Sequence, residues 1–133
     1  MIDALKAARD KGSVIVVAAG NEAQDVKNTT PGGCEGTISV AASDKSGQLA
    51  WYSNFGDVTI MAPGGDTRTS DETGLPPGVW SVVKLDADNP QGVEPMQGTS
   101  MATCCPGQPS SKSRCRSRSS TRSGSMVTRY PVK

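Results

Sequence analysis

The 133-residue chain contains no histidine. Histidine is the side chain that most often takes a proton from a serine hydroxyl in hydrolases, because its unperturbed pKa lies near neutral pH. A complete Ser-His-Asp triad within this chain is therefore excluded. A nucleophilic serine in this sequence would be half of a catalytic site, without its base.

Other residue types and patterns are also scarce. Aromatic residues make up 4% of the chain and hydrophobic residues 35%, which is lean for the core of one domain. No apolar stretch approaches the roughly 20 residues of a membrane span, and no apolar leader follows Met1. We therefore expect neither a membrane anchor nor a signal peptide in this chain. The four cysteines include no C-x-x-C pair, which argues against a zinc site.

Acidic residues are absent after residue 102. Residues 1–102 hold all 13 Asp and Glu and seven of the 14 Lys and Arg, whereas residues 103–133 hold the other seven basic residues. The end of the chain is rich in Ser and Arg and has too little apolar surface to offset the entropy of ordering. We expect an irregular tail over residues 104–133, separate from a domain over residues 1–103. Its charge would bind nucleic acid only without sequence preference.

Local patterns before the tail predict a helix and several strands. Alanines and apolar residues at helical spacing predict a helix over residues 2–11 that packs on a sheet. The run at 14–19 is apolar at successive positions, which is typical of a parallel strand covered on both faces. Loops rich in Gly, Pro, Asn and Asp separate these segments, so we expect an α/β domain with its function on the loops. Further apolar runs predict strands at 37–42, 58–62 and 79–83.

The sequence GTSMA at 98–102 is the strongest candidate for a catalytic motif. Small neighbours leave the Ser100 hydroxyl exposed at the expected start of a helix, where the helix dipole favours developing negative charge. Asn21 follows the strand predicted at 14–19, at the sheet edge where α/β proteins bind ligands. Its amide NH₂ is a neutral donor, which suits an oxyanion formed only in a transition state. Each motif alone also has a structural explanation, as a turn at Asn21 and as a helix cap before Ser100.

Four motifs, taken together and in order, resemble the subtilisin-like serine proteases, or subtilases. They are AAGN at 18–21, YSNFG at 52–56, MAPG at 61–64 and GTSMA at 98–102. The resemblance corresponds to the C-terminal part of that family's catalytic domain. It implies a partial three-layer α/β/α fold with a mainly parallel sheet. Cys34, in its TTPGGC context, is most similar to the secreted bacterial branch, so the resemblance implies a secreted, monomeric parent.

The resemblance also implies roles for individual residues. Ser100 matches the nucleophile, and Asn21 matches the side chain that donates to the oxyanion. Residues 29–33 would lie near the far side of the pocket for the residue before the scissile bond. The near wall of that pocket matches Ala18, Ala19 and Gly20. The implied substrates are proteins or peptides, cleaved through an acyl-enzyme.

The chain departs from the family in three respects. The family's Asp and His motifs lie upstream of the matched region, so we expect this chain alone to be inactive. In the family, the cysteine at Cys34 pairs with one nearer the N-terminus, which is absent here. After Thr103 the family continues Pro-His-Val-Ala-Gly into an apolar helix, whereas this chain continues Cys-Cys-Pro-Gly into the Ser/Arg tract. A shift of reading frame near Thr103 and a tail that evolved as disordered sequence both explain this change.

Metal and partner predictions complete the analysis. Many subtilases bind calcium, so the resemblance leaves calcium open as a cofactor of a full-length parent. Asp66, Asp71 and Glu72 do not have the spacing of a calcium-binding loop, and we assign no metal ligand in this chain. The competing functional hypothesis is a non-enzymatic chain whose basic tail binds polyanions.

Overall fold

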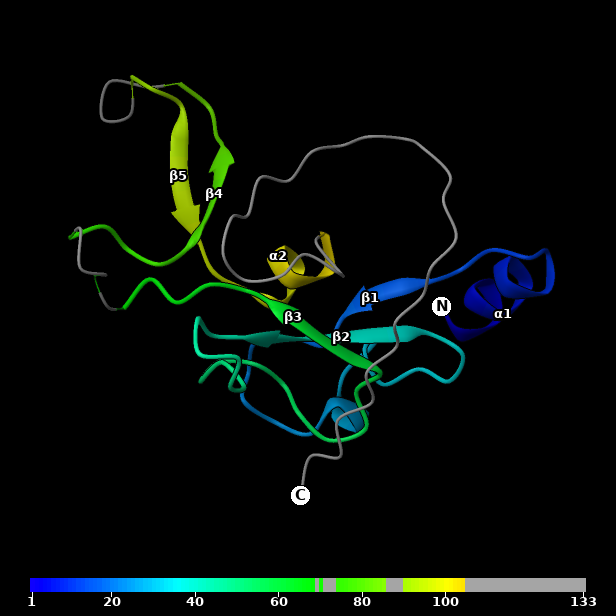
Figure 1. Ribbon diagram of the computed structural model, residues 1–133. Coiled ribbons are helices and arrows are strands. Elements are labelled where there is room, and N and C mark those ends of the chain that lie inside the picture. Colours follow the sequence, from blue (N-terminus) through cyan, green and yellow to red (C-terminus); the bar gives the residue numbers. More distant parts are fainter. Residues whose placement is uncertain (69, 71–73, 86–89, 105–133) are drawn as a thin grey trace, which may run out of the picture.

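A computed structural model describes residues 1–68, 70, 74–85 and 90–104 (Figure 1). The tail predicted over 104–133 lies outside these residues, except for Cys104. Eight elements follow one another along the described chain. They are helix α1 (Ile2–Asp10), strand β1 (Val16–Ala18), a short 3₁₀ helix (Val26–Asn28), strands β2 (Ile38–Ser43), β3 (Ile60–Pro63), β4 (Val79–Val82) and β5 (Val93–Met96), and helix α2 (Thr99–Cys104).

Strands β1, β2 and β3 form a parallel sheet with β2 in the middle (Figure 1). In the register, Val16 lies opposite Ile38, and Val40 lies opposite Ile60. Helix α2 contacts all three strands. The residues of β2 are therefore covered, and all of them except Ile38 are buried. The hydrophobic core consists mostly of small side chains: Val40, Ala42, Ala50, Tyr52, Ala62 and Ala102. This arrangement confirms the predicted α/β class with a mainly parallel sheet.

Two predictions about packing at the start of the chain are wrong. Helix α1 forms where predicted, but none of its residues is buried. Strand β1 is shorter than the apolar run at 14–19, and it is not covered on both faces. Val14 is 75% exposed and Val16 is 40% exposed. The side chains of this run are apolar enough for a buried strand, but those of Val14 and Val16 remain exposed.

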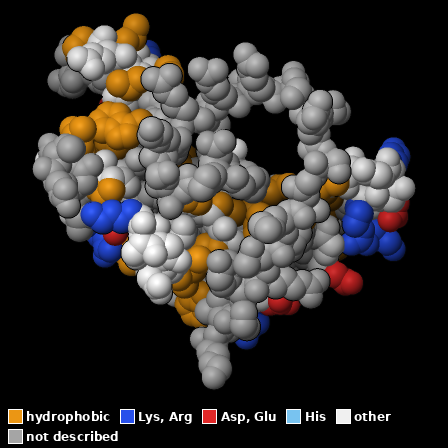
Figure 2. All heavy atoms as spheres, in the orientation of Figure 1, with side chains coloured by type: hydrophobic (Ala, Val, Ile, Leu, Met, Phe, Trp, Pro, Cys, Tyr) orange, Lys and Arg blue, Asp and Glu red, His pale blue; other side chains and the backbone are white. Residues whose placement is uncertain are grey.

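Strands β4 and β5 form a separate antiparallel ribbon. The sequence does not predict β5, because Glu94 and Pro95 interrupt its apolar pattern. The strand forms through pairing with β4, which places Val79 opposite Met96. Figure 2 shows hydrophobic side chains gathered on the surface of this part of the molecule, and Val82 is 83% exposed.

Candidate active site

Asn21 lies just beyond the carboxyl end of β1, after a glycine with a left-handed backbone. Gly20 has a φ of +109°, and a Cβ atom there would lie 2.6 Å from Glu22 Oε2 and would collide with the Asn54 side chain. A larger residue would therefore be strained by its backbone and would also have no space. The turn at Gly20 leaves Asn21 exposed at the sheet edge.

Ser100 lies in the first turn of α2. The carbonyl oxygen of Gly98 accepts hydrogen bonds from Met101 N at 3.1 Å and from Ala102 N at 3.2 Å, which begins the helix. The side chains of Thr99 and Ala102 are buried, whereas Ser100 is exposed. The helix therefore places Ser100 on the surface, as the small neighbouring residues predict.

A direct hydrogen-bonded contact joins the loop of Asn21 to the start of α2. Asn21 Oδ1 accepts hydrogen bonds from Thr99 N and Thr99 Oγ1, both at 2.9 Å. Thr99 Oγ1 in turn accepts a hydrogen bond from Gly20 N at 3.1 Å. A backbone N–H can only donate, so the amide atom of Asn21 that faces Thr99 must be its oxygen. The amide nitrogen of Asn21 makes neither of these bonds. It remains able to donate to other partners beside Thr99, the residue that precedes Ser100.

A hollow of about 410 Å³ opens at the same edge of the sheet. Residues 29–32 line this hollow. It is also lined by the three residues predicted as one wall of a substrate pocket, Ala18, Ala19 and Gly20. Thr29 Oγ1 donates to Ala19 O at 3.1 Å, which ties these two segments together. Among the described residues that line it, Glu22 is the one titratable residue.

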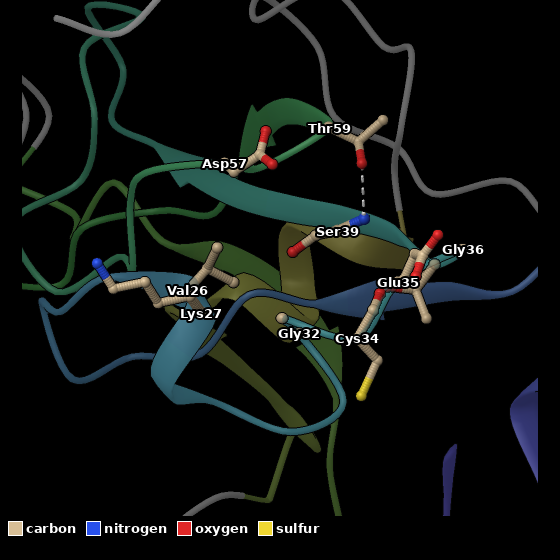
Figure 3. Close-up of a pocket in the computed structure, with 11 residues that line it drawn as sticks. Val26, Lys27, Gly32, Cys34, Glu35, Gly36, Ser39, Asp57 and Thr59 are labelled. Atoms are coloured by element: carbon tan, nitrogen blue, oxygen red, sulfur yellow. Dashed lines mark hydrogen bonds between the residues drawn. The ribbon is translucent and has the colours of Figure 1, made fainter. Parts of the chain in front are cut away.

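A second hollow, of about 340 Å³, lies at the opposite edge, where β2 and β3 begin (Figure 3). Cys34 and Asp57 are among its lining residues. Ser39 N donates to Thr59 Oγ1 at 3.1 Å, whereas the buried Ser39 Oγ has no partner among the described residues. The two hollows share a single lining residue, Gly32, so this second hollow does not belong to the site of Asn21 and Ser100.

Asp66, one of the acidic residues considered for calcium, forms an ion pair instead. Arg68 Nη2 lies 2.8 Å from Asp66 Oδ2, and the guanidinium lies over the Trp51 ring, 4.3 Å from its centroid. The hydrogen bonds from Arg68 lower the pKa of Asp66 to about 2. Asp71 and Glu72 lie outside the described residues. The described part of the chain has no group of three or more His, Cys, Asp and Glu side chains that could hold a metal ion.

Two residues of the site are missed by sequence analysis, Thr99 and Asn54. Both side chains are fully buried and hydrogen bonded to the loop of Asn21. Their position inside the GTSMA and YSNFG motifs is the available signal in the sequence. The hydrogen-bond partners of Thr99 and Asn54 lie far away along the chain. Neither motif therefore predicts what its buried polar side chain contacts.

Comparison with known families gives a match to the subtilase family, peptidase S8, over residues 1–105. The chain belongs to the subtilase family. An extracellular protease of Xanthomonas campestris pv. campestris is 39% identical to this subtilase over 75 residues, which is 56% of this chain and 13% of the relative. Proteinase T of Parengyodontium album is 45% identical over 60 residues, which is 44% of this chain and 20% of the relative.

Solved structures of proteases share the fold. A protease from Pseudoalteromonas arctica matches this subtilase with a TM-score of 0.64 and 35% identity, over 77% of this chain and 30% of that chain. A cold adapted subtilisin-like serine proteinase matches with a TM-score of 0.55 and 27% identity, over 76% of this chain and 31% of that chain. The predicted family and fold are thus confirmed. This subtilase spans a fifth or less of the two relatives above. None of its described helices has the length and apolar character that crossing a membrane requires.

Proposed function

We propose that this chain supplies the nucleophile and the oxyanion donor of a serine endopeptidase site. The observation that carries the proposal is the pair of hydrogen bonds from Thr99 to Asn21 Oδ1, each 2.9 Å long. They leave the amide nitrogen of Asn21 for other partners, beside Thr99, the residue that precedes Ser100. A donor held in this way costs little reorganisation when an oxyanion forms next to it.

The reaction follows from these two groups. Ser100 Oγ attacks the carbonyl carbon of the scissile peptide bond, and the carbonyl oxygen takes the electron pair. Asn21 Nδ2 and the Ser100 N–H donate hydrogen bonds to the resulting oxyanion, an arrangement for which subtilisin is itself a standard example. The tetrahedral adduct then expels the amine, which takes up the proton that Ser100 Oγ gave to the missing base, and leaves an acyl group on Ser100. Water hydrolyses that ester in the second half of the reaction.

The hollow beside Asn21 is the proposed site for the side chain that precedes the scissile bond. Its lining of Ala18, Ala19 and Gly20 leaves space for a substrate side chain next to the donor. Relatives named as extracellular proteases support a secreted parent that acts on proteins or peptides.

The proton on Ser100 has no histidine to accept it, because the chain contains none. We therefore propose that this chain by itself does not hydrolyse peptide bonds at the rate of a triad. The missing base and the acid that orients it would come from a part of the parent outside this sequence.

The proposal can be tested by supplying the missing base in solution. In a fluorophosphonate probe, Ser100 Oγ would bond to phosphorus, fluoride would leave, and added imidazole would accept the proton. We expect imidazole to accelerate labelling of the purified chain, while casein stays intact. Ser100→Ala should abolish the labelling, and Asn21→Leu, which removes the donor, should slow it. Ser13→Ala, at another exposed serine, is the matched control and should leave the labelling unchanged.

Two results would contradict this proposal. Labelling that persists in Ser100→Ala would show that Ser100 is not the nucleophile. Casein hydrolysis in the absence of imidazole, abolished by Ser100→Ala, would show that the chain finds a base without histidine.

The competing function, polyanion binding, rests on the seven basic residues and the absence of acid in residues 103–133. It predicts binding of duplex DNA that weakens steeply with added salt and is lost when the chain is shortened to residue 104. Fluorescence anisotropy with labelled DNA measures both effects.

A further inference from the structure

A buried segment, Tyr52–Asn54, lies between the two loops of the site and belongs to the YSNFG motif. Tyr52 is 4% exposed, Ser53 is 1% exposed and Asn54 is 0% exposed. Buried polar groups are costly unless they are hydrogen bonded. All three side chains do form hydrogen bonds, and the partners show what the segment holds in place.

Asn54 holds the loop of Asn21. Its Oδ1 accepts hydrogen bonds from Glu22 N at 3.0 Å and from Gln24 N at 3.1 Å. Its Nδ2 donates to Ala19 O and to Glu22 Oε2, both at 2.9 Å. These bonds use both donors and both acceptor positions of the amide. They fall on each side of Asn21 rather than on Asn21 itself, so Asn54 sets the path of the backbone that carries it.

Tyr52 holds the loop that precedes Ser100. Its hydroxyl donates to Gly65 O at 2.9 Å and accepts from Gly98 N at 3.1 Å. Gly98 N also donates to Gly64 O at 2.9 Å, so the glycine is held from two directions. Burial raises the pKa of Tyr52 from 10.0 to about 12, so its hydroxyl stays protonated and able to donate well above neutral pH.

Ser53 anchors both contacts to the central strand. Its Oγ accepts a hydrogen bond from Ala42 N at 2.9 Å and donates to Asn54 O at 3.0 Å. Ala42 belongs to β2 and is fully buried. The loops of Asn21 and Ser100 are thus held from one segment that is fixed to the middle of the sheet.

We propose that Tyr52 and Asn54 are positioning residues of the active site. Asn54 places the loop of Asn21 and Tyr52 places the loop of Ser100, so that one segment sets the separation between oxyanion donor and nucleophile. The inference rests on the function proposed above for Asn21 and Ser100.

The test measures amide hydrogen exchange by NMR in the full chain, with Tyr52→Phe and Asn54→Ala. The Thr99 amide donates to Asn21 Oδ1, so it reports whether the two loops remain joined. The Ile38 amide donates to Ile15 O at 2.8 Å, at the far end of the sheet, and reports general opening. We expect Tyr52→Phe, which removes two hydrogen bonds, to accelerate exchange at Thr99 by about tenfold or more relative to Ile38, because one bond is worth roughly 1 kcal/mol. Asn54→Ala removes four hydrogen bonds and should accelerate it at least as much.

Ile60→Ala is the control for general destabilisation, since Ile60 packs against the core but has no part in these hydrogen bonds. It should accelerate exchange at Thr99 and Ile38 equally. If Tyr52→Phe accelerates exchange equally at Thr99 and Ile38, Tyr52 has a merely structural role and the proposal is overturned. A Thr99 amide without protection in the unsubstituted chain would also overturn it. If Asn54→Ala does not fold, Tyr52→Phe decides, because it removes one oxygen atom and no packing.

Fluorophosphonate labelling of the same variants, with imidazole, separates this inference from the proposed function. Loss of Thr99 protection without labelling of Ser100 in any variant would support the positioning role and reject the nucleophile. Unchanged Thr99 protection and unchanged labelling in Tyr52→Phe would reject the positioning role and support the nucleophile.

Discussion

The side-chain oxygen of Asn21 accepts hydrogen bonds from both the backbone nitrogen and the hydroxyl of Thr99, across 78 residues of sequence. The loop after β1 and the start of α2 are therefore joined directly, and not only through the sheet on which both rest. This contact also determines which atom of the Asn21 amide remains for other partners. Perturbing it should affect both stability and chemistry.

Thr99→Val should destabilise the fold, whereas Thr99→Ser should retain most of its stability. Valine keeps the shape but removes the hydroxyl that bonds to Asn21 Oδ1 and Gly20 N. Thr99 is 0% exposed, so the unpaired partners should cost about 1–3 kcal/mol. Denaturant unfolding followed by tryptophan fluorescence measures the difference. Equal stability of the two variants would show that the hydroxyl contributes nothing.

Gly20→Ala should destabilise the fold more than Gly47→Ala. Both glycines have positive φ, +109° and +80°, but nothing lies within 4 Å of a Cβ atom at Gly47. Gly47→Ala should therefore cost about 1–2 kcal/mol for the backbone alone. Gly20→Ala adds a collision with the Asn54 side chain and should cost roughly 3 kcal/mol or more. Similar unfolding free energies for the two variants would contradict the crowding at Gly20.

Stability should fall as the pH drops below about 4, in part through Asp66. Its hydrogen bonds from Arg68 lower its pKa from 3.8 to about 2. The Asp66 carboxylate is therefore more stable in the folded state than in the unfolded state. Its contribution to the free energy of unfolding is present above the unfolded pKa and is lost as the pH falls from 3.8 through about 2. Asp44, whose pKa is lowered by Ser46, titrates in the same direction.

Asp66→Asn isolates that contribution. The unfolding midpoint of this variant, measured from pH 2 to pH 6, should depend less on pH than that of the unsubstituted chain. Arg68→Gln removes the partner of Asp66 and should likewise reduce the pH dependence of the unfolding midpoint between pH 2 and pH 6. Because Arg68 lies over Trp51, both substitutions should also change the Trp51 fluorescence. A pH dependence that neither variant alters would show that the ion pair does not contribute.

Val40→Ala and Val82→Ala should differ strongly, although both valines belong to strands. Val40 is 0% exposed and lies in the core, so its truncation should cost about 2 kcal/mol. Val82 is 83% exposed in β4, and its truncation should change stability by less than about 0.5 kcal/mol. Chemical unfolding of both variants tests the contrast. A comparable loss in Val82→Ala would reveal a cover over the β4–β5 ribbon.

Much of the site could be predicted because its residues lie in short, contiguous motifs. The small neighbours of Ser100 predict its exposure, and the apolar run before Asn21 predicts a strand whose end carries it. Whether that run is buried could not be predicted. Val16 is apolar enough for a core position, but it is 40% exposed. The strand at 93–96 could not be predicted either, because its pairing with β4 outweighs the unfavourable Pro95.

The sequence by itself determined the family and the α/β class, and it predicted Ser100 as the nucleophile and Asn21 as the oxyanion donor. It also excluded a histidine base, because composition and short motifs are local properties of a chain. Only the tertiary structure decided that Thr99 orients Asn21, that Asn54 and Tyr52 hold the two loops, and that the strand before Asn21 is half uncovered. Those properties depend on hydrogen bonds and packing between residues 13 to 78 positions apart, and no local pattern specifies such partners.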